Sequence, residues 1–374
     1  MSTADAVSPD SDRPWATPGA WPVAPGVHRI PLPLPNDGLR AVNVYAIETA
    51  DADGTSLTLV DGGWAITEAD EALEAALASI GAGVGDIRRF LVTHVHRDHY
   101  TQAVALRRVT GAEVALGRGE EPSLRLAAEG GAVRRVMAAH LADAGAVEAA
   151  QGWLDAPPDP DANPGIWELP DTWIDGDVPL VVGSRRLDAV HTPGHTAGHY
   201  VFADTAATLL FAGDHVLPTI TPSIGFEPDT RLGALTDFLA SLAKVRALPD
   251  LRLLPAHGPV TGSSHARVDE LLGHHETRLA QSLAPLEAGG AGSTAEDVAR
   301  HLTWTRREHA WTSLDQFNAA LAVMETRAHL EVLVARGEAV VERDGGFVDA
   351  IGAAAGSLPG SDPLSGVPAR YRRA

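Results

Sequence analysis

The chain has 374 residues, among them 49 acidic and 29 basic side chains and no cysteine. Without cysteine the protein has no disulfides, thiolate metal ligands or cysteine nucleophile, which fits a reducing compartment. The formal net charge of −20 disfavours nonspecific binding to phosphate backbones, so a nucleic-acid partner is not expected.

Residues 1–25 are predicted to form a disordered leader, because they are rich in Ser, Asp, Pro and Ala. Residues 1–20 lack the basic segment followed by an apolar one that marks a secretory signal. No apolar stretch reaches the length of about 18 residues that a membrane helix needs. The sequence therefore predicts a cytoplasmic protein without a membrane partner.

Apolar runs and turn signals divide the following sequence into strands and helices. In chain order we predict strands over 42–47 and 56–61, a helix over 68–80, a strand over 89–93, a helix from Asp98, a strand over 113–116 and helical sequence over 118–150. Residues 155–175, dense in Pro, Asp and Trp, are expected to form a long loop of the kind that walls a pocket. After this loop we predict strands over 180–182, 186–191, 200–203 and 208–212, a helix over about 230–247 and a strand over 252–255.

A second module is predicted to begin near Gly262. Its expected elements are a helix over 269–286, a short helix ending near Leu302 with a capping signature over 293–296, a helix over 314–336 ended by Gly337, and a hairpin over 338–348. Helices followed by a hairpin suggest a small winged-helix unit. The predicted organisation is the leader, a first domain over 26–262, a winged-helix-like domain over 263–351 and a disordered tail over 352–374.

Four stretches that could bind metal follow predicted strands. They are Thr93-His94-Val95-His96-Arg97-Asp98-His99, the run from His191 to His199 around His195, Leu210 to Asp214, and Leu254 to Gly258 around His257. Imidazole and carboxylate suit Zn²⁺ and similar divalent ions. His94 and His96 can share one ion, because residues two apart on an extended turn project to one side. Asp98 and His99 can reach a neighbouring ion about 3.5–4 Å away, a spacing that supports a bridging hydroxide.

Together these stretches resemble the hydrolase branch of the metallo-β-lactamase fold superfamily, over roughly residues 27–262. The motifs that carry the resemblance are HxHxDH, HTPGHT, an apolar strand ending in Gly-Asp, and a strand-terminal histidine before glycine. The resemblance implies an α/β fold, an αββα sandwich, that holds two divalent metal ions. It implies that His94, His96 and His195 bind one ion, that Asp98, His99 and His257 bind the other, and that Asp214 is shared between them.

Other features narrow the resemblance. Asp61, in Val60-Asp61-Gly62-Gly63, is similar to the family's early Asp-x-Gly element, which supports the metal-binding loops. The B1-type lactamases use a metal-binding cysteine that this chain lacks. The redox di-iron branch has Glu at the position of His96, and the B3-type lactamases lack an acidic bridge such as Asp214. β-Lactamase activity is therefore not expected as the main role.

The sequence after His257 is similar to the beta-lactamase-like protein 2 subgroup, which includes an endoribonuclease of animals. Over residues 263–350, 8 basic and 14 acidic side chains give a net charge of −6. A winged helix that grips nucleic acid should be basic. We therefore expect the module to pack against the first domain or against a second subunit in a homodimer.

Several residues near the ligands have candidate roles. Tyr100 adjoins the metal loop and His215 follows Asp214, so both are candidates for a substrate pocket, with core packing as the alternative. The segment 218–223 is a candidate for a substrate-facing loop or a plain turn. His191 and His199 flank His195 and are expected to pack or to form hydrogen bonds.

The expected function is hydrolysis of an ester, thioester or lactone of a small-molecule substrate, with two metal ions, Zn²⁺ ahead of Fe or Mn. Asp98 would be catalytic, because it would orient the attacking hydroxide besides binding metal. One alternative is a metal-dependent endoribonuclease or phosphodiesterase, since the same site can cleave phosphodiesters. Another is a catalytically silent regulatory protein that binds through the winged helix.

Overall fold

The computed structural model describes residues 14–35, 38–51, 54–157, 164–228, 232–304, 309–343, 346–348, 363–364 and 367–374. The chain divides into two compact units, each assembled from separate parts of the sequence. Unit 1 comprises residues 1–125, 165–222 and 240–270, and unit 2 comprises residues 126–164, 223–239 and 271–374. The division differs from the single boundary predicted near Gly262, because two segments upstream of it belong to unit 2.

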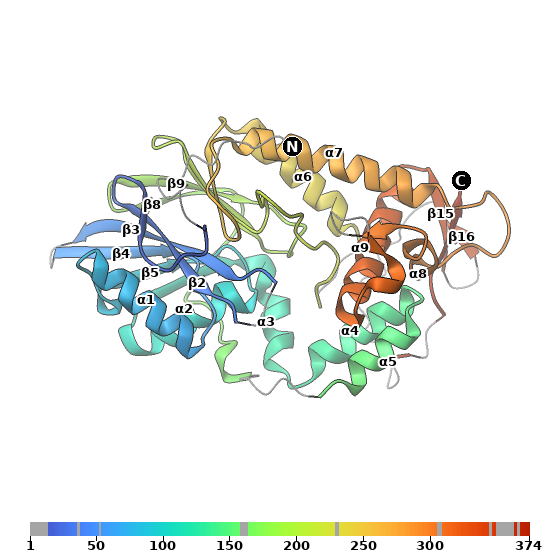
Figure 1. Cartoon of the computed structure of the whole chain (residues 1–374), viewed down its shortest axis with the longest axis horizontal. Helices are drawn as coiled ribbons and strands as arrows, with labels where there is room; N and C mark the ends of the chain where they lie inside the picture. The colour runs from blue at the N-terminus through green and yellow to red at the C-terminus, as the bar shows by residue number, and fades with distance from the viewer. Residues whose placement is uncertain are drawn as a thin grey trace. The chain divides into compact units, whose positions relative to one another are not determined.

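Unit 1 is built on two β-sheets (Figure 1). The first sheet has seven strands in chain order: β1 (Trp21–Ala24), β2 (Val27–Pro33), β3 (Ala41–Asp51), β4 (Gly54–Val60), β5 (Ile87–Leu91), β6 (Glu113–Gly117) and β7 (Thr172–Ile174). The second has five strands in the order β12 (Arg252–Pro255), β11 (Leu209–Gly213), β10 (Tyr200–Asp204), β9 (Arg185–His191) and β8 (Val178–Val182). Each predicted strand of this unit is therefore present.

The inner faces of the two sheets share one apolar core. Tyr45 and Leu91 from the first sheet join Phe202 and Phe211 from the second in a single buried cluster. The rings of Tyr45 and Phe211 pack edge to face, with their centroids 5.4 Å apart. Strands β10 and β11 are buried at every position, which explains why they read as continuous apolar runs rather than as alternating ones.

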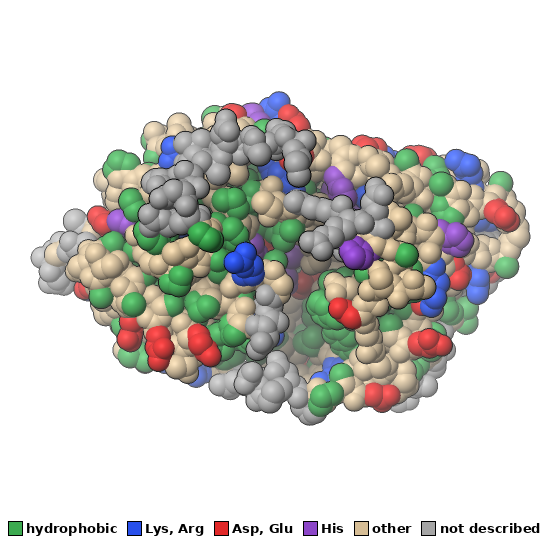
Figure 2. Space-filling view, in the orientation of Figure 1, with side chains coloured by type: hydrophobic (Ala, Val, Ile, Leu, Met, Phe, Trp, Pro, Cys, Tyr) green, Lys and Arg blue, Asp and Glu red, His purple; other side chains and the backbone are tan. Residues whose placement is uncertain are grey.

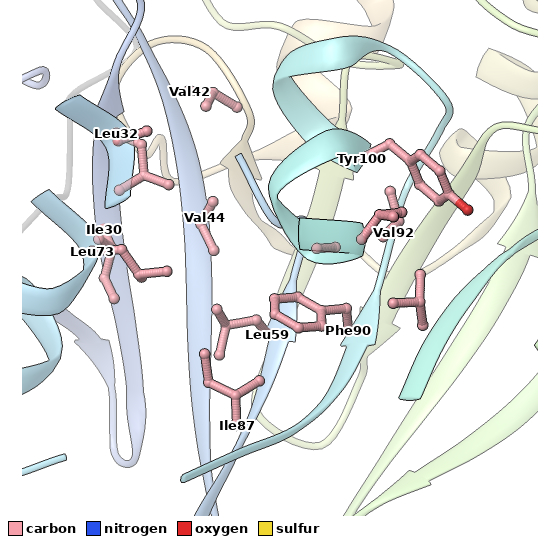
Figure 3. Close-up of a cluster of buried hydrophobic side chains, with 14 of the residues drawn as sticks. Ile30, Leu32, Val42, Val44, Leu59, Leu73, Ile87, Phe90, Val92 and Tyr100 are labelled. Atoms are coloured by element: carbon pink, nitrogen blue, oxygen red, sulfur yellow. The ribbon is translucent and has the colours of Figure 1, made fainter. Parts of the chain in front are cut away.

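Helices α1 (Thr67–Ser79) and α2 (Arg97–Thr110) cover the outer face of the first sheet. Figure 3 shows Leu73 from α1 and Tyr100 from α2 packed over Val44 and Phe90 of the strands. Two helix segments of unit 1 lie against the second sheet. They are the later part of α6 (Ala234–Ala247) and the start of α7 (Ser264–Leu283). Ser241 Oγ of α6 donates to the carbonyl of Pro193 after β9, at 2.8 Å. The layers follow the expected αββα order.

Short elements complete the connections of unit 1: η1 (Val84–Asp86), η2 (Arg118–Glu120), and α3 (Glu121–Ala128) and η3 (Pro164–Ile166), which cross the unit boundary.

Two predictions need correction here. Residues 21–24, predicted to lie in the leader, form β1, because Trp21 pairs with Arg29 of β2 and Val23 is buried. Residues 172–174, predicted to lie in the long loop, form β7 through parallel pairing with β6. Residues 1–13 and 158–163 lie outside the described part.

Unit 2 is mainly helical. Besides the parts of α3, α6 and α7 that fall in this unit, its elements are α4 (Ala132–Asp143), α5 (Val147–Asp155), α8 (Ala295–Ala299), the pair β13 (Thr303–Trp304) and β14 (His309–Ala310), η4 (Trp311–Ser313), α9 (Gln316–Ala335), β15 (Ala339–Arg343), β16 (Gly346–Val348) and β17 (Arg370–Arg373). The predicted helices and hairpin are present. The cap of α8 is Thr294 with Asp297, one residue later than predicted. None of the helices in the described ranges has the length and apolar character needed to cross a bilayer.

The end of the predicted disordered tail is ordered. Strand β17 pairs antiparallel with β15, and Tyr371 exchanges two backbone hydrogen bonds of 2.8 Å with Ser293. Tyr371 is also buried. These partners are distant in sequence, so local composition did not reveal the strand. Residues 352–362 and 365–366 of the predicted tail lie outside the described part.

Two buried histidines connect α7 and α9 within unit 2. His329 Nδ1 donates to the carbonyl of Glu325 at 2.8 Å, so its Nε2 is bare and accepts from His275 Nδ1 at 3.2 Å. The Nε2 of His275 is then an acceptor, and it has no hydrogen-bond partner. Burial lowers the pKa of His275 to about 2 and that of His329 to about 4.

These lowered pKa values predict a stability that depends on pH. In the unfolded chain both histidines titrate near 6.5, so their neutral burial is fully favourable above that pH and becomes costly as pH falls below it. We expect the urea midpoint of the protein to fall between pH 7 and pH 5, and to fall less in His275→Leu. The exposed His309→Gln should follow the wild type. Parallel pH profiles for wild type and His275→Leu would contradict the interpretation.

Candidate metal centre

The seven predicted ligands come from the carboxyl ends of four strands. His94 and His96 follow β5, and Asp98 and His99 lie in the first turn of α2. The others are His195 after β9, Asp214 directly after β11, and His257 after β12. All seven fall into two groups whose potential ligand atoms lie within 4.8 Å of one another. The predicted convergence at one edge of the sheets is therefore observed.

The first group is His94, His96, His195 and Asp214. His96 Nδ1 lies 2.9 Å from His94 Nε2 and 3.2 Å from His195 Nε2. His195 Nε2 lies 3.6 Å from Asp214 Oδ2. Ligands about 2.0–2.2 Å from a tetrahedral Zn²⁺ are separated by about 3.3–3.6 Å from one another. The His195–Asp214 separation falls within this range and the two separations that involve His96 are shorter, so the four side chains lie close enough together to surround one such ion.

The second group is Asp98, His99 and His257. Asp98 Oδ2 lies 3.6 Å from His99 Nε2 and 3.4 Å from His257 Nε2. Asp214 also reaches this group, because its Oδ1 lies 3.4 Å from His257 Nε2 and 3.7 Å from His99 Nε2. The two oxygens of Asp214 thus face different groups. This is the geometry expected of a carboxylate shared by two ions.

In His99 and His257, a hydrogen bond made by Nδ1 determines which ring nitrogen carries the proton. His99 Nδ1 donates to Asp61 Oδ2 at 3.0 Å, and His257 Nδ1 donates to the carbonyl of Ala41 at 2.8 Å. Their Nε2 atoms therefore carry lone pairs directed into the site. These two Nε2 atoms and Asp214 Oδ1 are buried without a hydrogen-bond partner. Buried acceptors without donors are costly, and a cation would satisfy all three.

Asp61 supports two strand ends, as the resemblance implied. Its Oδ1 accepts from the backbone N–H and the hydroxyl of Thr93, at 2.8 and 2.9 Å, while Oδ2 holds His99. Thr93 Oγ1 in turn accepts from His94 Nδ1 at 3.0 Å. Asp61 has a φ of 62°, a left-handed conformation that Asp and Asn adopt more readily than most residues. One buried carboxylate thus orients a ligand of each group.

His199 orients Asp214, in agreement with the hydrogen-bonding role expected for it. Its Nε2 accepts from the backbone N–H of Asp214 at 3.2 Å, so its Nδ1 donates to Thr192 Oγ1 at 2.9 Å. Gly213, with a φ of 51°, brings the end of β11 between His199 and Thr93. A Cβ on Gly213 would lie 2.7 Å from both side chains. The Gly-Asp pair of the motif therefore has a steric reason.

Sequence reasoning missed the residues that hold His257. Asn43 Nδ2 donates to the carbonyls of Pro255 and Gly258, at 3.0 and 2.9 Å, and Tyr45 Oη donates to that of Pro255 at 2.8 Å. Arg29 Nη1 fixes Asn43 Oδ1 at 2.9 Å. All three side chains are buried. Their only signal in the sequence is the presence of polar residues within apolar strands.

The site's charges are set by its neighbours. Burial lowers the pKa of His94 well below its usual value, and His99 lowers it further, so His94 is a neutral donor. At Asp98 and Asp214 the histidines outweigh burial and lower the pKa values. At His99 and His257 the carboxylates outweigh burial and raise the pKa values. The carboxylates thus attract positive charge, for which protons and a metal ion compete.

The structure corrects both candidates for the substrate pocket. Tyr100 is a core residue (Figure 3). Its hydroxyl donates to the carbonyl of Glu168 at 2.6 Å. The helical rotation that brings Asp98 and His99 to the site turns Tyr100 away from it. His215 is also fully buried, with its ring 6.0 Å from that of His199. Burial lowers the pKa of His215 to about 3, so its neutral form is favoured.

Comparisons with known proteins match this geometry. The family model described as metallo-beta-lactamase superfamily matches residues 37–257. A beta-lactamase-like protein 2 homolog of Caenorhabditis elegans is 32% identical over 106 residues, 28% of this chain and 33% of that protein. The lactamase-like protein aptB of Emericella nidulans is 35% identical over 132 residues, 34% of this chain and 40% of that protein. The matches therefore span well under half the length of these relatives.

Two solved structures resemble the chain over nearly its whole length. A metallo-beta-lactamase family protein from Thermus thermophilus is 28% identical, with a TM-score of 0.69, and covers 94% of this chain and 100% of its own. A beta-lactamase domain protein from Burkholderia ambifaria is 24% identical, with a TM-score of 0.74, and covers 98% and 97%. The second likeness concerns the fold alone.

Proposed function

The chain belongs to the metallo-beta-lactamase superfamily, whose hydrolases depend on metal, and on that premise we propose that it uses two divalent metal ions to hydrolyse an ester, thioester or lactone. The observation that carries the proposal is the set of buried acceptors without donors, His99 Nε2, His257 Nε2 and Asp214 Oδ1. Nitrogen and carboxylate ligands at these separations favour Zn²⁺.

Each group of side chains would hold one ion, with Asp214 contributing to both. When bound, the two ions would lower the pKa of a water molecule and polarise the carbonyl of the substrate. Asp98 and His96 are the ligands that are only partly buried, so solvent and substrate would approach on their side. The carboxylate of Asp98 would accept a hydrogen bond from the attacking water and orient it. The hydroxyl of Thr93 is bonded to Asp61 and is not free to act as a nucleophile.

Metal content and chelation test the proposal. The purified protein should contain close to two equivalents of transition metal, measured by mass spectrometry. Dialysis against a strong chelator should lower ester or thioester hydrolysis at least about a hundredfold, because the ions would supply the positive charge that polarises the carbonyl. Added Zn²⁺ should restore the rate. Metal-free protein with undiminished activity, or wild type without turnover on thioesters, lactones and esters, would contradict it.

Phosphodiester cleavage is the second candidate, because the same donors could polarise a phosphoryl oxygen and a matched relative is a beta-lactamase-like protein 2 homolog. Charge opposes it: on the face shown in Figure 2, Lys and Arg side chains lie scattered among Asp and Glu, and the described residues form no broad basic surface there. An RNA substrate in the panel, tested at low and high salt, separates the two candidates.

The remaining proposals concern unit 2. We propose that its C-terminal part is winged-helix-like and takes part in a homodimer rather than in nucleic-acid binding. Light scattering of the purified protein tests the dimer. A gel shift with DNA tests the alternative of a regulatory binding protein, which the complete set of metal-binding side chains disfavours.

A further inference from the structure

The segment that leaves the metal site after Asp214 forms an exposed loop. His215, Val216 and Leu217 are buried, whereas Thr219 and Ile220 are exposed. Ile220 is among the few large apolar side chains of unit 1 that are exposed, at 37%. We call residues 217–220 the rim loop.

Arg267 of α7 holds both ends of the rim loop. Its Nε donates to the carbonyl of Leu217 at 2.6 Å, and its Nη2 donates to that of Ile220 at 2.9 Å. Its Nη1 is engaged with Glu270 at 2.8 Å, and the side chain is 14% exposed. The planar guanidinium fixes two carbonyls three residues apart, which a lysine can do only in part. Arg267 therefore determines the shape of the loop without contacting the ligands.

Gly258 places the rim loop beside the metal-binding side chains. Gly258 directly follows His257 and has a φ of 105°. A Cβ at this position would lie 2.7 Å from Cγ of Pro218 and 3.6 Å from Oγ1 of Thr219. The loop begins three residues after Asp214 and returns to pack against the residue after His257. It thus borders the part of the site where Asp214 and His257 meet, 3.4 Å apart.

We propose that the rim loop selects the substrate: Ile220 contacts an apolar acyl group, and Arg267 is the positioning residue that holds Ile220 there. The inference rests on the proposed function, since it assigns the substrate class of the same site. Ile220 is an exposed apolar side chain on a loop that leaves the site after Asp214 and packs against Gly258, so it would provide the apolar contact that the polar ligands cannot. The favoured substrates are then esters or thioesters of medium-length apolar acids rather than of acetate.

The experiment compares p-nitrophenyl octanoate with p-nitrophenyl acetate, which share a leaving group and differ in the acyl chain. For Ile220→Ala we expect the octanoate-to-acetate ratio of kcat/KM to fall about fivefold, mostly through KM, because part of an apolar contact is lost. Arg267→Ala should lower the same ratio, and Arg267→Lys should restore it in part. Val181→Ala, which removes an exposed aliphatic side chain from β8, should leave it unchanged.

The outcomes separate the two proposals. If the wild type shows no metal-dependent turnover on any ester, thioester or lactone of the panel, the proposed function is overturned and this inference with it. Turnover with an unchanged ratio in Ile220→Ala overturns the inference alone. A fall that Val181→Ala reproduces also overturns it. Because Ile220 is exposed, its variant tests the inference even where Arg267→Ala is unstable.

Discussion

Replacing Asp214 with alanine should remove metal from both groups and abolish hydrolysis. Its Oδ2 faces His195 in the first group, and its Oδ1 faces His257 in the second. The loss of this one side chain therefore removes one metal ligand from each group. We expect kcat/KM to fall about a thousandfold or more, equal to about 4 kcal/mol of transition-state stabilisation. Metal content should fall below one equivalent per chain.

Two further variants show whether the charge of Asp214 is responsible. Asp214→Asn keeps the size of the side chain but removes the charge shared by the two groups, so its activity should also be strongly reduced. Asp188→Ala is the matched control, because Asp188 is a carboxylate on β9 that pairs with Arg186 on the surface. A full complement of metal in Asp214→Ala would contradict the assignment of a shared ligand. So would equal losses in Asp214→Ala and Asp188→Ala.

The ligand residues were predictable because each lies at the end of a strand with a strong local pattern. His94, His96, Asp98 and His99 fall within six residues, and Asp214 ends a continuous apolar run. Carboxyl ends of neighbouring parallel strands meet at one edge of a sheet, and β11 and β12 are such a pair. Local sequence therefore carried both the chemistry and the place of these residues.

The supporting residues were not predictable in the same way. Asn43 and Tyr45 hold the backbone at Pro255, more than 200 residues away in the sequence. Tyr100 was misassigned because closeness to Asp98 along the chain does not mean closeness in a helix. Adjacent positions on α2 point about 100° apart, so the neighbour of two ligands lies in the core. Such long-range and rotational relations appear only when the fold is formed.

Asp61→Asn should reverse the tautomer of His99 while leaving the fold intact. The left-handed φ of 62° at Asp61 suits asparagine, and the amide oxygen can still accept from Thr93. An amide NH₂ in place of Oδ2, however, donates toward His99 Nδ1, which can then only accept. The proton moves to Nε2, the atom that faces the metal site. A protonated Nε2 cannot bind metal. The ring of His99 would therefore keep its orientation but would no longer coordinate an ion.

The expected result is a ten- to hundredfold loss of Zn²⁺ affinity, of about the size found when a residue that orients a metal-binding histidine is changed. Competition with a chromophoric chelator measures the affinity, and ¹⁵N spectra of the imidazoles identify the protonated nitrogen. Asp177→Asn is the control, because Asp177 Oδ1 accepts from the backbone N–H of His191 at 2.8 Å but touches no ligand ring. An unchanged unfolding midpoint in Asp61→Asn separates tautomer control from structural loss. Wild-type Zn²⁺ affinity in that variant would mean that the tautomer of His99 is fixed by something other than Asp61.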